Sequence, residues 1–171
     1  MIAMTLDLHA FDSPIGPLVL AARGEQLVAL HLPKSADPPP RGTARQTPIL
    51  ERAARQLAEY FAGARTEFEL DLAPEGTAFQ RSVWSALLAI PFGTTSTYGA
   101  IARSIARPSA SRAVGAANGR NPIAVIIPCH RVIGSTGALT GFGGGLPAKQ
   151  FLLAHERAHR RTPQLSLAGY A

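Results

Sequence analysis

The stretch TYGAIARSIARPSASRAVGAANG, residues 97–119, predicts two short helices joined by a tight turn. Thr97 can cap a first helix over residues 98–106, and the Arg-Pro pair that follows ends it, because proline cannot continue a helix. Ser109 can then open a second helix over about residues 110–119. Two helices with this spacing are typical of a helix-turn-helix.

The second of these helices consists mostly of small side chains, with Arg112 as its one long side chain. A helix that reads bases in the major groove normally carries long polar residues. Small residues such as Ser111, Ala113 and Gly115 instead permit close approach of the backbone, as a narrow minor groove requires. The pattern leaves one alternative open, which is a helix packed tightly in the protein core.

The positive charge of the chain is concentrated in the part that contains these helices. Residues 1–75 hold seven Lys/Arg against ten Asp/Glu, a net −3, whereas residues 76–171 hold ten Lys/Arg against the single acid Glu156, a net +9. Nine of those ten are arginines, whose forked guanidinium group suits phosphate. The asymmetry favours a nucleic acid as partner over an arginine-rich composition caused by a GC-rich genome, which would affect both halves.

The first 76 residues predict a small α/β lobe. A proline-rich loop is expected over residues 33–48, and the apolar residues of 49–62 have helical spacing. Short strands are expected at residues 5–11, 17–22, 26–32 and 68–72. We therefore expect an α+β protein of two unequal lobes, in which a small antiparallel sheet with a helix precedes a mostly helical lobe.

The second lobe is expected over residues 77–157. Thr77 can cap a helix over residues 78–90, and Pro147 can open a last helix over residues 146–156. The glycine-rich segment 140–145 does not match the spacings of nucleotide-binding loops, so no nucleotide cofactor is expected. Residues 158–171 are expected to form a basic, disordered tail.

The only cysteine, Cys129, lies in the run IIPCHRVI, residues 126–133, and is the candidate nucleophile. A lone buried cysteine is usually inert, but here a histidine follows it directly. Neighbouring side chains of an extended chain point to opposite faces, so a water would have to join the sulfur to His130. Glu156 could hold the imidazole, or could instead form a surface ion pair with Arg157 or Arg160. The positive field of this lobe would favour the thiolate.

The cysteine count and the hydropathy also restrict the setting of the protein. One cysteine excludes an internal disulfide bond and a cysteine-rich zinc site, which fits a reducing compartment. No signal peptide and no apolar stretch of about 20 residues is present, so no membrane association is expected. We expect a cytoplasmic protein.

Together these residues resemble the O6-alkylguanine-DNA alkyltransferase family. The family's active-site motif matches Pro128-Cys129-His130-Arg131-Val132, and the likeness covers roughly residues 78–157. It extends through Tyr98, residues 111–115, residues 119–122, the glycine-rich loop and residues 152–156. The first lobe fits the family's ribonuclease-H-like domain in outline.

The resemblance implies a DNA repair reaction that each molecule performs once. Cys129 would attack the alkyl carbon on O6 of guanine, or on O4 of thymine, in duplex DNA, and would keep the alkyl group as a thioether. The nucleotide must leave the duplex to reach a pocket. The resemblance implies no cofactor. Some members of the family carry a structural zinc in the first lobe or a separate phosphotriester-repair domain, but the single cysteine and the short chain argue against both here, so no metal is expected. We expect a monomer, with cooperative binding along DNA left open.

The resemblance also gives each motif residue an expected role. His130, through a water, would take the thiol proton while Glu156 holds its ring, Tyr98 would donate toward N3 of guanine, and Asn121 would form the turn before the active-site segment. Arg112 would fill the gap left by the flipped base, and the other expected DNA contacts are Ser111, Ala113, Gly115, Tyr98, Arg120 and Arg131. The expected substrate pocket consists of Val125, Ile127, Pro128, Phe142, Gly143 and Gly144.

One departure from the family pattern concerns alkyl-group selectivity. The family often has tyrosine followed by serine or alanine where this chain has Phe142 and Gly143. Phenylalanine keeps the stacking face but lacks the hydroxyl, so a hydrogen bond to O6 from this position must come from a backbone amide. Two other classes compete with the alkyltransferase interpretation, namely a DNA-binding regulator or damage-recognition protein without chemistry and a cysteine hydrolase.

Overall fold

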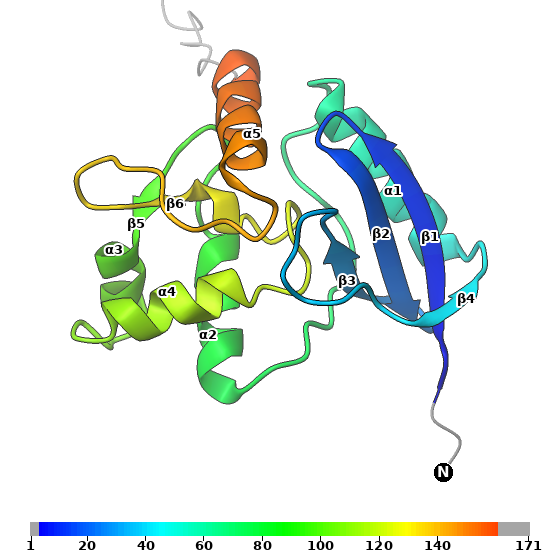
Figure 1. The fold of residues 1–171 in the computed structure, drawn as a ribbon, viewed down its shortest axis with the longest axis horizontal. Coiled ribbons are helices and arrows are strands. Elements are labelled where there is room, and N and C mark those ends of the chain that lie inside the picture. Colours follow the sequence, from blue (N-terminus) through cyan, green and yellow to red (C-terminus); the bar gives the residue numbers. More distant parts are fainter. Residues whose placement is uncertain (1–3, 161–171) are drawn as a thin grey trace, which may run out of the picture.

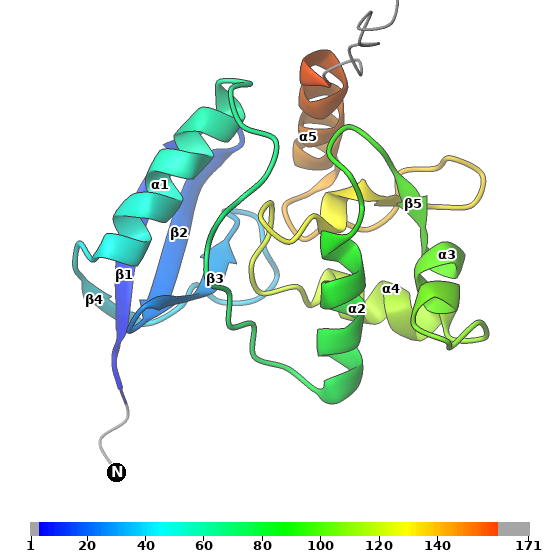
Figure 2. The same ribbon diagram turned by 180° about the vertical axis from the view of Figure 1, so that it is seen from behind.

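Two lobes lie side by side in the computed structural model, which describes residues 4–160 (Figure 1). The first lobe is a four-stranded sheet in the order β3-β2-β1-β4 with one helix, α1 (Pro48–Phe61), on one face, as Figure 2 shows from behind. Its strands are β1 (Leu6–Ser13), β2 (Gly16–Arg23), β3 (Gln26–His31) and β4 (Gly42–Ala44). The first three pair antiparallel, and β4 pairs parallel with β1.

Helix α1 packs on the sheet because its apolar residues recur every three or four positions. Leu50, Ala53, Leu57 and Tyr60 are all completely buried. This spacing gives one apolar stripe along an α-helix. The helix therefore has a fixed rotation on the sheet, and Tyr60, near its C-terminal end, extends its side chain toward Glu156 of the second lobe.

Two expectations for the first lobe were wrong. Residues 68–72 do not form a strand, and only a single bridge joins Leu72 to Leu27. The proline-rich loop contains the edge strand β4, whose three exposed residues pair with β1. Whether a segment pairs at a sheet edge depends on a partner far along the chain. The alternation of apolar and polar residues over three to five positions does not show whether such a partner is available.

The second lobe is mostly helical, as expected. Its helices are α2 (Ala78–Leu88), α3 (Tyr98–Ser104), α4 (Ser111–Gly119) and α5 (Leu146–His159), with one 3₁₀ turn at Cys129–Arg131. Two short strands, β5 (Ser96–Thr97) and β6 (Val132–Ile133), pair in parallel. Helix α5 runs three residues further than expected, and residues 161–171 of the expected tail lie outside the described residues.

Local hydrogen bonds explain where these helices begin. Thr77 Oγ1 accepts from the backbone N–H of Gln80, whose side-chain oxygen accepts from the backbone N–H of Thr77, so α2 begins with a complete capping box. Thr97 Oγ1 caps α3 by accepting from Ala100. The cap of α4 is Ala110, without a side-chain hydrogen bond, and the expectation of Ser109 was one residue early.

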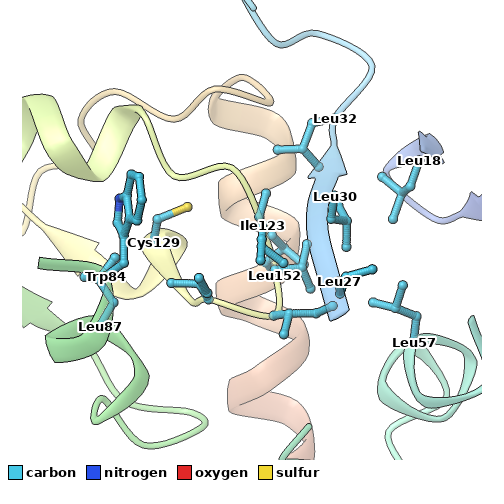
Figure 3. Close-up of a cluster of buried hydrophobic side chains, with 14 of the residues drawn as sticks. Leu18, Leu27, Leu30, Leu32, Leu57, Trp84, Leu87, Ile123, Cys129 and Leu152 are labelled. Carbon is cyan, nitrogen blue, oxygen red and sulfur yellow. The ribbon is translucent and has the colours of Figure 1, made fainter. Parts of the chain in front are cut away.

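One apolar core passes through both lobes. Leu27 and Leu30 of β3 pack with Ile123 and with Leu152 of α5, and the cluster continues to Trp84 and Cys129 (Figure 3). The backbone N–H of Leu30 also donates to the carbonyl of Pro122 at 2.9 Å. The segment that leads to the cysteine is therefore fixed against a strand of the other lobe. Within residues 4–160, no helix has both the length and the apolar character needed to cross a bilayer.

Candidate active site

Two asparagines near the end of α4 shape the segment that carries the cysteine. Asn121 Nδ2 donates to the carbonyl of Ile127 at 2.8 Å, and its Oδ1 accepts from the backbone N–H of Ile123 at 3.0 Å. Asn118 Nδ2 donates to the carbonyl of Cys129 at 3.3 Å. Between Ile123 and Ile127, which Asn121 links, Val125 has φ +71°, a left-handed conformation that is strained for a β-branched residue. The side-chain hydrogen bonds hold this turn closed.

Cys129 begins the 3₁₀ turn and lies at a cavity of about 200 Å³ between the two lobes. Its side chain is nearly buried, at 4% exposure. The second lobe contributes Asn118, Asn121, Ala124, Phe142 and Gly143 to the cavity wall, and the first lobe contributes residues of β3 and of the proline-rich loop, among them His31, Leu32, Asp37 and Pro38.

Burial raises the pKa of the Cys129 thiol, and it outweighs the lowering by a hydrogen bond with Asn121 and by the charge of Lys149. The positive charge of Lys149 favours the thiolate, as expected of this lobe, but its effect is smaller than that of burial, so the net shift is opposite to the expected one. Burying the thiolate charge costs more free energy than its attraction to the nearby positive charge contributes. The sulfur needs a base before it can act as a nucleophile.

His130 and Glu156 form a buried pair beside the cysteine. His130 Nε2 lies 2.7 Å from Glu156 Oε1, and the two side chains are 0% and 1% exposed. Burial lowers the pKa of His130, which keeps the imidazole neutral near neutral pH. Since a carboxylate can only accept, the ring proton lies on Nε2 and Nδ1 carries a lone pair. Nδ1 is buried and has no hydrogen-bond partner among the described residues.

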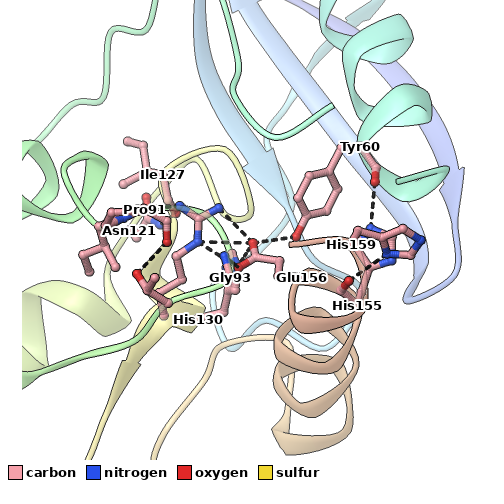
Figure 4. A network of polar contacts seen from close by, with 12 residues as sticks. Tyr60, Pro91, Gly93, Asn121, Ile127, His130, His155, Glu156 and His159 are labelled. Atoms are coloured by element: carbon pink, nitrogen blue, oxygen red, sulfur yellow. Dashed lines mark hydrogen bonds and ion pairs between the residues drawn. The ribbon is translucent and has the colours of Figure 1, made fainter. Parts of the chain in front are cut away.

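Glu156 is held as an anion by its neighbours. Burial alone would raise its pKa, but hydrogen bonds from His130 and Arg131, together with the charge of Arg131, lower the pKa of Glu156 to about 2. Arg131 donates to both carboxylate oxygens, from Nε at 2.9 Å to Oε2 and from Nη2 at 2.8 Å to Oε1. The hydroxyl of Tyr60 donates to Oε1 as well, and the backbone N–H of Gly93 completes the contacts (Figure 4).

These contacts correct two interpretations of the sequence. Arg131 is 7% exposed, and its guanidinium also donates to the carbonyl of Ile90 at 2.7 Å and lies over the ring of Phe92. The expectation that Arg131 contacts DNA was therefore wrong, because its hydrogen-bonding groups are used inside the protein. The alternative that Glu156 forms a surface ion pair with Arg157 or Arg160 is also excluded, since its partner is Arg131.

The helix-turn-helix presents the face that the sequence suggested. On α4 the side chains of Val114, Ala117 and Asn118 are buried, whereas Arg112 and Ala113 are exposed and Ser111 and Gly115 are half-buried. One side of the helix thus packs in the core while the small residues and Arg112 face outward. Arg120, just past the helix, is exposed and lies 3.7 Å from the carboxylate of Asp37 in the other lobe.

Tyr98 lies at the start of α3, with its ring beside Gly115 of α4. Its hydroxyl lies 3.1 Å from Thr140 Oγ1, at the entrance to the glycine-rich loop. Lys149 holds the other side of this loop, because its buried ammonium donates to the carbonyls of Thr140 and Val132. The phenol therefore lies between the exposed face of the helix-turn-helix and the loop that borders the cavity.

The residues expected for the substrate pocket, which stays a prediction, overlap in part with those that line this cavity. Phe142 and Gly143 border the cavity, but Val125, Ile127, Pro128 and Gly144 are not among the residues that line it. Residues that sequence reasoning missed take their place, namely Asn118, Ala124 and the first-lobe segment around Asp37. Tyr60 was missed too, because no local pattern reports a contact across 96 positions.

Family models match both lobes of the chain. The DNA binding domain of 6-O-methylguanine DNA methyltransferase matches residues 78–158, and the ribonuclease-like domain of the same family matches residues 8–74. The chain belongs to the 6-O-methylguanine DNA methyltransferase family.

Individual relatives cover nearly the whole protein. The methylated-DNA–protein-cysteine methyltransferase of Methanosarcina acetivorans is 52% identical over 148 residues, 85% of this chain and 95% of the relative. That of Mycolicibacterium paratuberculosis is 50% identical over 90% of this chain and 94% of its own. A crystal structure of Mycobacterium tuberculosis OGT in complex with DNA superimposes with a TM-score of 0.83 at 49% identity, covering 90% of this chain and 94% of that one.

Proposed function

We propose that this protein is a methylated-DNA–protein-cysteine methyltransferase, which repairs DNA by moving the alkyl group from O6 of guanine to Cys129. The observation that carries the proposal is the arrangement of Cys129, His130 and Glu156 in a chain about half identical to proteins of that name over nearly their full length. The DNA complex of a close structural neighbour supports DNA as the partner.

The geometry supports a stepwise transfer of one proton and one alkyl group. His130 Nδ1, with its free lone pair, takes the thiol proton through a bridging water, and Glu156 stabilises the imidazolium. The sulfur then attacks the alkyl carbon in line, a carbon–sulfur bond forms, and the bond between carbon and O6 breaks. The leaving guanine gains negative charge, which Tyr98 stabilises as a hydrogen-bond donor toward N3. The thioether is not cleaved to regenerate the thiol of Cys129, so each molecule acts once.

Helix α4 supports delivery of the damaged base through the minor groove. A base inside a duplex cannot present O6 to Cys129, so the nucleotide must be flipped out at a cost of a few kcal/mol. The small outward residues of α4 permit close approach to a narrow groove, and Arg112 is long enough to fill the gap in the base stack. The expelled base would enter beside Phe142, whose ring offers a stacking face at the cavity.

The proposal is tested by mass spectrometry after incubation with a duplex that contains O6-methylguanine. We expect a gain of about 14 mass units on the Cys129 peptide, at no more than one equivalent per chain. The matched control is Cys129→Ser, which keeps the size of the side chain and should gain nothing. A parallel duplex with O4-methylthymine tests the second substrate. Turnover well beyond one equivalent, or an unmodified wild-type protein that still binds the duplex, would contradict the proposal.

A further inference from the structure

Tyr60 brings the first lobe into contact with the buried pair of the second lobe. Its hydroxyl donates to Glu156 Oε1 at 2.9 Å, and its side chain is completely buried (Figure 4). Its backbone carbonyl accepts from His155 Nε2 at 2.7 Å. The rings of Phe61, Phe68 and Phe92 pack around the phenol, with centroids 5.1, 5.5 and 6.0 Å away. These contacts leave the hydroxyl little freedom to turn away from Glu156.

The hydroxyl of Tyr60 is a permanent neutral donor. Burial, followed by the negative charge of Glu156, raises the pKa of Tyr60 far above the physiological range. The oxygen that it contacts is the same Oε1 that accepts from His130 Nε2 and from Arg131 Nη2. Donors that share one oxygen compete for its negative charge, so each weakens the hydrogen bonds of the others.

We propose that Tyr60 is a positioning residue for alkyl transfer, which acts through Glu156 by orienting the carboxylate and limiting how strongly it supports a positive charge on His130. This inference rests on the proposed function. It also gives the ribonuclease-like domain a part in the chemistry, because Cys129, His130 and Glu156 all lie within the matched DNA binding domain and Tyr60 does not.

The sign of the effect follows from the shared oxygen. Without the hydroxyl, Oε1 carries more negative charge, the hydrogen bond from His130 Nε2 strengthens, and the imidazolium is favoured. Since His130 must be neutral to accept the thiol proton, the acid limb of the rate profile should move to higher pH, by roughly half to one unit for one hydrogen bond. At pH values on the acid limb, the transfer rate of Tyr60→Phe would be about 3- to 10-fold below that of the wild type, and at alkaline pH the two rates would differ little.

The other charged groups around His130 stay the same in the variants. Glu156 and Lys149 face it from α5, Arg131 follows it in the 3₁₀ turn, and Cys129 precedes it. A shift of the profile in a Tyr60 variant can therefore be assigned to the hydroxyl.

The test measures single-turnover alkyl transfer against pH for wild type, Tyr60→Phe and a protein with 3-fluorotyrosine at position 60. Fluorination makes the phenol a stronger donor, so it should move the acid limb to lower pH, opposite to Tyr60→Phe. The matched control is Phe61→Leu, which disturbs the same aromatic cluster and leaves the hydroxyl in place. Its profile should keep the wild-type midpoint even if the protein is less stable.

A nuclear magnetic resonance titration of the His130 ring nitrogens gives the same answer without activity. Tyr60→Phe should raise the midpoint pH of the His130 titration, and it should raise the ratio of charged to neutral imidazole at a fixed acid pH. The fluorinated protein should lower both. Unchanged titration in both proteins, or shifts of the same sign, would overturn the inference. Failure of the proposed function would show differently, as absence of alkyl-Cys129 in the wild-type protein.

Discussion

Replacing Glu156 by glutamine should destabilise the protein at neutral pH and remove much of its sensitivity to acid. The pKa of Glu156 is lowered from 4.5 to about 2 in the fold. At 1.36 kcal/mol per pKa unit, the ionised carboxylate contributes about 3 kcal/mol of stability. Because the folded-state pKa is the lower one, this contribution is complete above the unfolded pKa and is lost as the pH falls through the folded pKa.

The variant lacks this contribution at every pH. Glutamine preserves the shape of the side chain but leaves the buried guanidinium of Arg131 without its counter-charge. Breaking a buried pair in this way costs about 3–5 kcal/mol, a large share of the 5–15 kcal/mol that stabilises a typical domain. The difference in unfolding free energy between wild type and variant should therefore be largest near neutral pH and should shrink by most of about 3 kcal/mol toward pH 2.

Urea unfolding followed by fluorescence of Trp84 measures this difference, since Trp84 is the only tryptophan and is 2% exposed. The matched control is Glu67→Gln at an exposed carboxylate, which should change stability by no more than about 0.5 kcal/mol at any pH. A difference between wild type and Glu156→Gln that is the same at neutral and acid pH would refute the reasoning.

Four other outcomes follow from the site and the fold. Arg112→Ala should slow repair of duplex by about 10-fold or more, yet change the reaction with free O6-benzylguanine less than about twofold, because only the duplex requires a flipped base. Affinity for duplex should fall at least about tenfold between 50 and 200 mM salt in a filter-binding assay. Asn121→Ala removes the donor to the carbonyl of Ile127 and should cost about 1–3 kcal/mol in urea unfolding, with slower transfer. Gly63→Ala should lower thermal stability by about 1–2 kcal/mol, since φ is +77° and the new methyl group would overlap the ring of His159.

The starts of helices α2 and α3 were predictable because their causes are local. The capping box of Thr77 and Gln80 and the cap at Thr97 involve residues three positions apart, so they can be read directly from the sequence. The strand β4 and the absence of a strand at residues 68–72 were not predictable. Strand pairing depends on which strand, far along the chain, has free backbone groups at its side. The residues of a short segment do not carry this information.

The candidate site divides in the same way. Cys129, His130 and Glu156 were identified as chemical groups, and the structure brings the latter two within 2.7 Å. The pairing of Glu156 with His130 was expected, but its second partner, Arg131, was not identified, because ten basic residues of that half of the chain could have filled that role. The cavity beside Cys129 also has first-lobe residues in its wall, which no local pattern in the sequence indicates.

The sequence by itself determined which reactive groups exist, the small side chains of the second helix of the helix-turn-helix, and a mostly helical lobe rich in arginine. The structure showed that one face of this helix is outward. The tertiary structure alone decided that the thiol is protonated at rest, that Arg131 turns inward to Glu156, and that Tyr60 reaches the same carboxylate from the other lobe. The physical reason is that caps and turns depend on neighbours in the chain, whereas desolvation and charge pairing depend on everything that folding packs around a group.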